Sequence, residues 1–316
     1  MPNQINLFPS ELVFYKMFES KIISAEGLKK FKNFVEESYR GIDKQKKEFE
    51  DVVSTLKFGK LNEKSRKWAI KVLKGLRVVG VDGSQIKPLR EFGIPIGAVQ
   101  VAAYSVDHGF GKWNVNYLSK ILKLEENVDV VRYSMEMYML KKKMDGKSYL
   151  FYDGSFSPSF AKELNPKICK IYLESARKVL KNSEETKTPV FGYTDRSYAK
   201  DIAKSFGLDV YDTFLLEGMD FASYTEPMES GNLCYSYVKF SPSLPSRIEF
   251  PCWMLKKFNS FIKIVFAECL LGSTFAYPFV LERAHKYAVI SEKERRTIVE
   301  MIKKAKISFK WISKLR

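Results

Sequence analysis

The stretch RVVGVDGS, residues 77–84, is an apolar run that ends in Asp-Gly-Ser, and SYLFYDGS at residues 148–155 repeats the same design. Each run predicts a buried strand, because its residues are apolar and a glycine lets the chain turn just after the aspartate. Asp82 and Asp153 are therefore expected at the carboxyl ends of two strands, where open α/β sheets hold their ligands. Two carboxylates in these positions predict a metal site.

Strands and helices alternate around these two runs, which is the order of an α/β fold. The predicted strands span residues 77–84, 95–106, 112–118, 149–153 and 189–193, with tight turns near 92–93 and 108–109, and the predicted helices span 129–143, 158–181 and 196–206. We expect one main domain over residues 76–292, with an irregular insertion that contains a hairpin at 208–255. A helical extension is expected over residues 1–75 and a basic helix over 293–316.

The composition is that of a globular protein, since 45% of the 316 residues are hydrophobic and 14% are aromatic. No run of about 18 uninterrupted apolar residues is present, so no membrane span is expected. The N-terminus lacks the basic start and apolar stretch of a secretory signal, which predicts a cytoplasmic protein. The four cysteines lack the spacing of a zinc site and are expected to be buried free thiols, and His108 is expected on a surface loop.

The chain is strongly basic, with 53 Lys and Arg against 37 Asp and Glu and a net charge of +16. A polyanionic partner such as nucleic acid follows, because neutralising phosphates releases counterions and supplies affinity. The alternative is that the charge serves solubility alone. The densest basic region is residues 293–316, with nine Lys and Arg against two Glu.

A third carboxylate falls between the two Asp-Gly-Ser motifs in the sequence. Glu136 lies midway along the helix expected at 129–143, so acids sit on the first strand, the first helix and the fourth strand. This is the order of an RNase H-like core, in which the first and fourth strands are adjacent and their ends can share a divalent ion. Hard divalent ions prefer oxygen ligands, and two ions can clamp the attacking and leaving oxygens of a phosphodiester.

Each candidate also has an alternative without chemistry. Either Asp-Gly-Ser could be only a turn, Glu136 could lie on a solvated helix face, and His285 could be a structural helix residue. His285 is flanked by Arg283 and Lys286, which suits an edge that faces phosphates. An imidazole added to carboxylates favours Mn²⁺ alongside Mg²⁺.

These motifs together resemble the NurA nucleases of archaea. The resemblance rests on VGVDGS around Asp82, on Glu136 seventeen residues before Asp153 in FYDGSF, and on YPFVLERAH ending at His285, and it covers residues 76–292. It implies an RNase H-like mixed sheet flanked by helices, a homodimer, and Mn²⁺-dependent DNA cleavage with Mg²⁺ as the alternative ion and two ions per site. It further implies single-strand endonuclease and 5′-to-3′ exonuclease activity in DNA end resection, coupled to a HerA-type hexameric translocase. The catalytic and metal-binding residues would be Asp82, Glu136, Asp153 and His285.

Basic residues near these motifs are candidates for holding the DNA strand: Arg196, Lys200, Arg283 and Lys286. The family commonly has a lysine just after the fifth strand, and Arg196 is the nearest cation here. Two rival functions stay open. One is another RNase H-like nuclease, such as a junction resolvase or RNase H, and the other is a non-catalytic nucleic-acid-binding subunit that retains the fold.

Overall fold

The computed structural model describes residues 25–87, 96–123, 126–157, 165–242, 244–272 and 277–304. The predictions for residues 1–24, the turn at 92–93, the start of the helix after Pro158 and residues 305–316 lie outside this part of the chain. The chain divides into two compact units, Met1–Thr55 and Leu56–Arg316. In the first unit, α2 (Ala25–Thr55) is a single helix, as the spacing of its apolar residues predicts.

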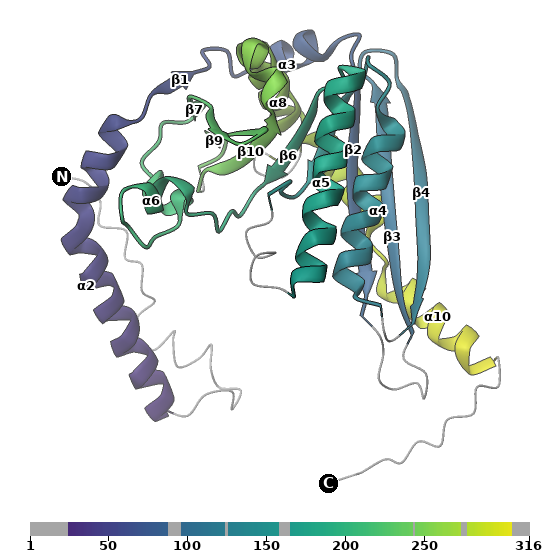
Figure 1. The fold of residues 1–316 in the computed structure, drawn as a ribbon, viewed down its shortest axis with the longest axis horizontal. Helices are drawn as coiled ribbons and strands as arrows, with labels where there is room; N and C mark the ends of the chain where they lie inside the picture. Colours follow the sequence, from purple (N-terminus) through teal and green to yellow (C-terminus); the bar gives the residue numbers. More distant parts are fainter. Residues whose placement is uncertain are drawn as a thin grey trace. The chain divides into compact units, whose positions relative to one another are not determined.

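The second unit contains a mixed sheet and the helices that cover it (Figure 1). Its strands are β1 (Phe58–Lys60), β2 (Arg77–Ile86), β3 (Ile96–Asp107), β4 (Lys112–Lys123), β5 (Tyr149–Asp153), β6 (Val190–Thr194), β7 (Ser223–Thr225), β8 (Met228–Ser230), β9 (Leu233–Lys239) and β10 (Ser246–Pro251). Its helices are α3 (Arg66–Leu73), α4 (Val128–Lys143), α5 (Pro166–Thr186), α6 (Asp201–Ser205), α7 (Asp212–Leu215), the 3₁₀ helix η2 (Cys252–Lys257), α8 (Phe258–Leu271), α9 (Phe279–Ala288) and α10 (Glu292–Lys304).

The strand order confirms the RNase H-like fold. Within the described residues the order is β1-β7-β9-β10-β6-β5-β2-β3-β4, with β8 paired to β9. β2, β3 and β4 form the predicted antiparallel meander. β5, the fourth of the predicted strands, lies against β2 and runs parallel to both β2 and β6. The first and fourth strands of the core are therefore neighbours, as the order of the acidic residues predicts.

Helices cover both faces of the sheet. Val79 and Val81 of β2 pack with α4 and α5 in one buried cluster, and Figure 1 shows these two helices side by side over the same face. Val78 of β2 and Phe151 of β5 belong to a second cluster, which includes residues of α3, α8 and α9. This alternation along β2 follows from the two-residue repeat of a strand, and it sends Asp82 to the face that carries α9.

The sheet extends further than the predicted elements. The boundary between the two units lies at residue 55, whereas the helical extension was placed over 1–75. Residues 56–75 contribute β1, which pairs with β7, and α3, which contacts α8. The predicted hairpin is present as β9 and β10, and β10 continues the sheet from β6. A capping box at Ser291 starts α10, since Ser291 Oγ accepts a 3.2 Å hydrogen bond from the backbone N–H of Glu294.

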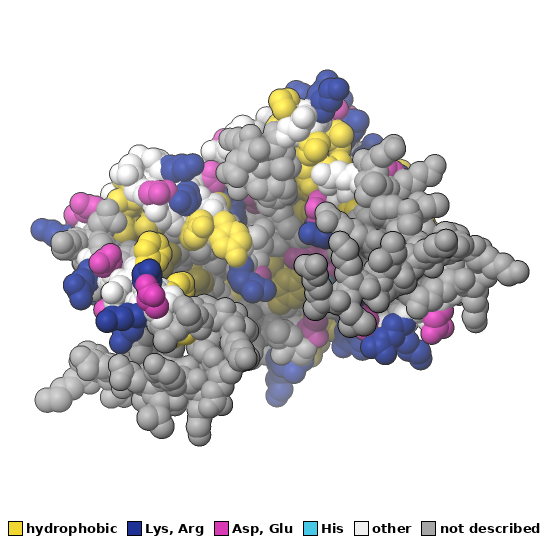
Figure 2. Space-filling view, turned by 90° about the horizontal axis from the view of Figure 1, so that it is seen from below, with side chains coloured by type: hydrophobic (Ala, Val, Ile, Leu, Met, Phe, Trp, Pro, Cys, Tyr) yellow, Lys and Arg dark blue, Asp and Glu magenta, His cyan; other side chains and the backbone are white. Residues whose placement is uncertain are grey.

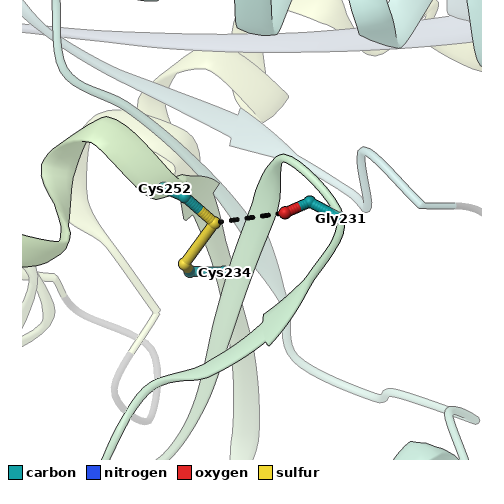
Figure 3. The surroundings of a disulfide bond; sticks show 3 residues. All are labelled: Gly231, Cys234 and Cys252. Atoms are coloured by element: carbon teal, nitrogen blue, oxygen red, sulfur yellow. Dashed lines mark hydrogen bonds between the residues drawn. A yellow bond between two sulfur atoms is a disulfide. The ribbon is translucent and has the colours of Figure 1, made fainter.

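Two predictions about sulfur and histidine are wrong. Cys234 and Cys252 form a disulfide between β9 and η2, with their Cα atoms 5.2 Å apart, and the Sγ of Cys252 lies 3.8 Å from the carbonyl oxygen of Gly231 (Figure 3). Only Cys169 and Cys269 are free thiols. His108 is buried rather than on a surface loop, and its Nε2 lies 2.6 Å from Oε1 of the buried Glu268. No helix in the described part of the chain has the length and apolar character needed to span a membrane.

Candidate metal centre

Strand pairing brings the two aspartates together. In the parallel pair of β2 and β5, Val81 is opposite Tyr152, so Asp82 and Asp153 are the next residues along and lie side by side. Asp153 is the last residue of β5, as predicted, whereas the turn predicted after Asp82 is absent, because β2 continues to Ile86 in its pairing with β3. Their side chains share the face of the sheet that carries α9, because each lies an even number of residues from a side chain of that cluster.

Helix α9 carries His285 across this face, and Gly80 permits the close approach. A Cβ atom at Gly80 would lie 2.2 Å from the carbonyl oxygen of Val280, a distance that real side chains do not reach. Glu268 on α8 fixes the same end of α9, because its Oε2 accepts a 3.0 Å hydrogen bond from the backbone N–H of Val280. The absence of a side chain at Gly80 and the buried carboxylate of Glu268 together set the position of the helix over β2.

His285 then reaches the carboxylate of Asp82. The distance from His285 Nδ1 to Asp82 Oδ2 is 2.7 Å, and Asp82 Oδ1 accepts a 2.7 Å hydrogen bond from the backbone N–H of Gly83. The hydrogen bond to Asp82 raises the pKa of His285, because the carboxylate favours the protonated ring. The Asp82 side chain is 5% exposed and the His285 side chain 61% exposed, so a buried carboxylate is hydrogen-bonded to an imidazole that reaches solvent.

Asp153 completes a group of three. One ligand atom from each of Asp82, Asp153 and His285 lies within 4.8 Å of the other two. Burial and, to a smaller extent, the negative charge of Asp82 raise the pKa of Asp153 to about 6, and a hydrogen bond from Tyr277 opposes the shift. A bound cation would reduce the electrostatic repulsion between two carboxylates held this close together.

The donor set fits a divalent ion of the Mn²⁺ or Mg²⁺ class. Two carboxylate oxygens and one imidazole nitrogen converge, and Mn²⁺ accepts such a mixed set more readily than Ca²⁺, which takes only oxygen ligands. The outer contacts also fit, since the backbone N–H of Gly83 and the hydroxyl of Tyr277 orient the two carboxylates.

Glu136, the fourth predicted member, lies next to this group and outside it. Its carboxylate is fully buried on the α4 side of the sheet, where Oε1 accepts a 2.9 Å hydrogen bond from Arg132 and Oε2 a 3.0 Å bond from Tyr152. Oε1 also fills the space that a Cβ at Gly83 would occupy, 2.4 Å away. Burial, against the opposing charge of Arg132 and with smaller contributions from Asp82 and Asp153, raises the pKa of Glu136 to about 8. The alternative of a solvated face residue is therefore excluded.

A scan against protein-family models matches the NurA domain over residues 76–290. This chain belongs to the NurA domain family. The match includes both Asp-Gly-Ser strands, α4 with Glu136, and α9 with His285. None of the curated protein sequences matches the chain.

Solved NurA structures share the fold at low sequence identity. The crystal structure of the NurA nuclease from Sulfolobus solfataricus is 15% identical and superposes with a TM-score of 0.66, covering 92% of this chain and 100% of that one. A crystal structure of NurA with manganese is 11% identical, with a TM-score of 0.52, and covers 90% of this chain and 98% of that one. At these identities the likeness supports the NurA fold and does not assign individual residues.

The turn after Asp153 is fixed by a residue that the sequence analysis missed. Glu249 of β10 is 1% exposed, and its Oε2 accepts hydrogen bonds from Ser155 Oγ at 2.9 Å and from the backbone N–H groups of Phe156 at 2.7 Å and Ser157 at 3.3 Å. The Nε of Arg247 donates to Oε1 of the same carboxylate at 2.9 Å.

Two of the missed residues, Glu249 and Glu268, share one signal in the sequence. Glu249 and Glu268 are acids inside otherwise apolar segments, and a carboxylate in such a segment has to be paired when it is buried. Tyr277 begins the YPFVLERAH segment that supported the resemblance to the NurA family. Arg132 lies one helical turn before Glu136, the spacing of an i,i+4 ion pair.

The four basic residues predicted to hold DNA lie in two separate places. Arg283 and Lys286 share α9 with His285, and the Arg283 guanidinium lies 5.2 Å from the centre of the Phe279 ring. Arg196 is 87% exposed beyond the end of β6, whereas Lys200 is paired with Asp209 at 2.6 Å. Figure 2 shows Lys and Arg side chains in several separate groups on one face of the molecule, so net charge alone does not define a path for DNA.

Proposed function

We propose that this NurA-domain chain is a metal-dependent DNA nuclease. The observation that carries the proposal is the convergence of Asp82, Asp153 and His285 from two adjacent strands and a distant helix, in a donor set suited to Mn²⁺. The net charge of +16 supports a polyanionic substrate.

The buried and exposed residues of the centre have different roles. Asp82 and Asp153 are the anionic ligands, held by Gly83 and Tyr277, and a bound divalent ion supplies Lewis-acid stabilisation of charge on the phosphate and activation of water. His285 is exposed enough to touch substrate, so it serves as a further ligand or moves a proton at Nδ1 or Nε2. Glu136 completes the site if its carboxylate exchanges Arg132 and Tyr152 for the ion.

The finer parts of the proposal follow the resemblance to the NurA nucleases. We infer two ions per site, single-strand endonuclease and 5′-to-3′ exonuclease activity, and a cytoplasmic role in DNA end resection with a HerA-type hexameric translocase. A homodimer is also inferred, and three exposed apolar side chains on the edge strand β4 support it: Trp113, Tyr117 and Ile121.

An incubation of end-labelled single- and double-stranded DNA with Mn²⁺, Mg²⁺ or EDTA tests the activity. We expect cleavage with Mn²⁺, none with EDTA, and a loss of about 10²-fold or more in Asp82→Asn and Asp153→Asn, with DNA binding retained. Asp209→Asn, an exposed aspartate that pairs with Lys200, is the matched control. Cleavage that survives in EDTA and in both variants would overturn the metal centre.

The same assay separates the rivals. An RNA–DNA hybrid and a four-way junction are added as substrates, and preferential cleavage of either one favours another RNase H-like nuclease. DNA binding without cleavage of any substrate, at every metal concentration, favours the non-catalytic subunit.

A further inference from the structure

A cavity of ≈ 300 Å³ lies away from the metal centre, at the opposite end of β2. Its wall is formed where β2 begins, β3 ends and β4 begins, together with the last turn of α4. Arg77 at this end and Asp82 at the metal centre are five residues apart on β2, or about 17 Å at the rise of a strand. The cavity is therefore a separate site.

Four cationic side chains line this cavity: Arg77, Lys112, Lys142 and Lys143. Strand pairing and the helix end bring them together, since Arg77 is opposite Asp107 on β3, and Asp107 is opposite Lys112 on β4. Lys142 and Lys143 are the last residues before the cap of α4.

The two carboxylates of the cavity are already satisfied. Asp107 accepts both Nε and Nη2 of Arg77, at 2.6 and 2.9 Å. Asp145 accepts the backbone N–H groups of Lys147 and Ser148 and the hydroxyl of Ser148, at 2.7 to 2.9 Å. Among the described residues neither acid forms an ion pair with a lysine, although the charge of Asp107 acts on Lys112 and that of Asp145 on Lys143. Four cations and two acids line the cavity, so the cations exceed the acids by two.

Three ammonium groups therefore face the cavity without a direct ion pair. Among the described residues, Lys112 and Lys142 form no ion pair, and Lys143 donates only to the neutral side-chain oxygen of Asn116. Burial lowers the pKa of Lys143, and the nearby charges of Lys142 and Arg77 lower it further, against the opposing effect of Asp145. A bound anion would reduce the electrostatic repulsion among these ammonium groups.

The C-terminal position on α4 does not account for this arrangement. Cations in the last turn of a helix favour its dipole, and Lys141, Lys142 and Lys143 all lie in that turn. However, only Lys142 and Lys143 line the cavity, where they meet cations from two strands. A hollow of this volume is at the small end of ligand pockets and suits a terminal group better than a strand passing along a groove.

We propose that this cavity binds a phosphate group, presented by a nucleotide or by the phosphorylated end of a nucleic-acid strand. The lysines supply the charge, and Ser105 and Asn114 on the cavity wall supply neutral donors. The proposal goes beyond the nuclease function and does not depend on it.

Titrations in EDTA test the site without cleavage. The ligands are inorganic phosphate, dAMP, and one oligonucleotide with or without a terminal phosphate, followed by calorimetry. We expect Lys142→Ala/Lys143→Ala to weaken binding of dAMP or the phosphorylated strand by tenfold or more. Lys141→Ala, one residue earlier on the same exposed turn and not on the cavity wall, is the matched control and should bind as the wild type does.

The outcomes separate the sources of phosphate. Tight binding of dAMP assigns the site to a nucleotide, and tight binding only of the phosphorylated strand assigns it to a nucleic-acid end. Equal losses in Lys141→Ala and in the double variant, equal affinity for phosphorylated and unphosphorylated strands, or no binding of any ligand would each overturn the proposal. Lys112→Ala, which changes a different element, repeats the test if the double variant is unstable.

Discussion

Nδ1 of His285 lies 2.7 Å from Oδ2 of Asp82, although the two residues are 203 positions apart in the sequence. The contact requires α9 to cross β2 at Gly80, so the geometry of the candidate metal centre depends on packing as much as on the ligands themselves. The contact also places a proton where a metal ion would bind, because Asp82 favours the protonated imidazole. Metal and proton therefore compete at this site.

The first prediction concerns pH and metal. Burial raises the pKa of Asp153 to about 6 and of Glu136 to about 8, so the folded chain holds these protons more tightly than the unfolded chain. The metal-free protein should therefore lose stability as pH rises from about 4 to about 8. A divalent ion removes this penalty, so the increase in Tm caused by Mn²⁺ should be larger at pH 8 than at pH 5.5.

Thermal unfolding with EDTA or Mn²⁺ across this pH range measures the effect. Asp153→Asn, which removes one titrating carboxylate from the pair, should flatten the metal-free slope and reduce the gain from Mn²⁺. An equal gain from Mn²⁺ at both pH values would contradict the competition between metal and proton.

The second prediction concerns His285. Because its side chain is 61% exposed, His285→Ala should change the free energy of unfolding by no more than about 1 kcal/mol. As a ligand or proton carrier, however, its loss should reduce the cleavage rate by about 10²-fold. Val289→Ala, an exposed change one turn later, is the control. A large loss of stability with unchanged specific activity would indicate a structural histidine.

The third prediction concerns the crossing of α9 over β2. A methyl group in Gly80→Ala would meet the Val280 carbonyl oxygen at 2.2 Å, so α9 has to move away from the strand. We expect a loss of about 1–3 kcal/mol in stability, the usual range for overpacking, and weaker Mn²⁺ binding. Gly218→Ala is the matched control, because a Cβ there meets no atom within 4 Å. If Gly80→Ala is destabilised but binds Mn²⁺ with unchanged affinity, the packing of α9 on β2 affects stability and not metal binding.

The fourth prediction concerns Glu249, which holds the turn after Asp153. Its two oxygens accept from opposite sides, Arg247 on one and the turn on the other, and an amide can accept on one side only. Glu249→Gln should therefore cost about 1–3 kcal/mol and weaken Mn²⁺ binding by shifting Asp153. Glu229→Gln, an exposed residue of β8, provides the comparison. Calorimetric titration with Mn²⁺ measures the binding, and an affinity equal to the wild type would limit Glu249 to a role in stability.

Local pattern accounts for the parts of the fold and site that the sequence predicts. Asp153 ends β5 as predicted, because the apolar run and the turn after it are adjacent in the sequence, and the parallel neighbours β2 and β5 follow from the order of the elements. Asp82 lies on the predicted strand but not at its end, because pairing with β3 extends β2 to Ile86. The buried position of His108 depends on Glu268, 160 residues away, and no local pattern reveals it. The same holds for the Cys234–Cys252 disulfide, which depends on the pairing of β9 with β10.

The position of Glu136 could be predicted from the sequence, but its hydrogen-bond partners could not. The sequence places it on the correct helix, but Arg132 and Tyr152 hold its carboxylate beside the group of Asp82, Asp153 and His285. Which partners a buried acid takes is decided by packing and charge in the folded chain.

The separation of 203 residues between Asp82 and His285 also sets the order in which the centre is built during synthesis. The two aspartates emerge from the ribosome early, with the strands that hold them, and the histidine follows only when α9 has been made. A nascent chain that stops before residue 285 would thus hold two carboxylates without their imidazole, and the ion-binding group becomes complete only after residue 285 has been made.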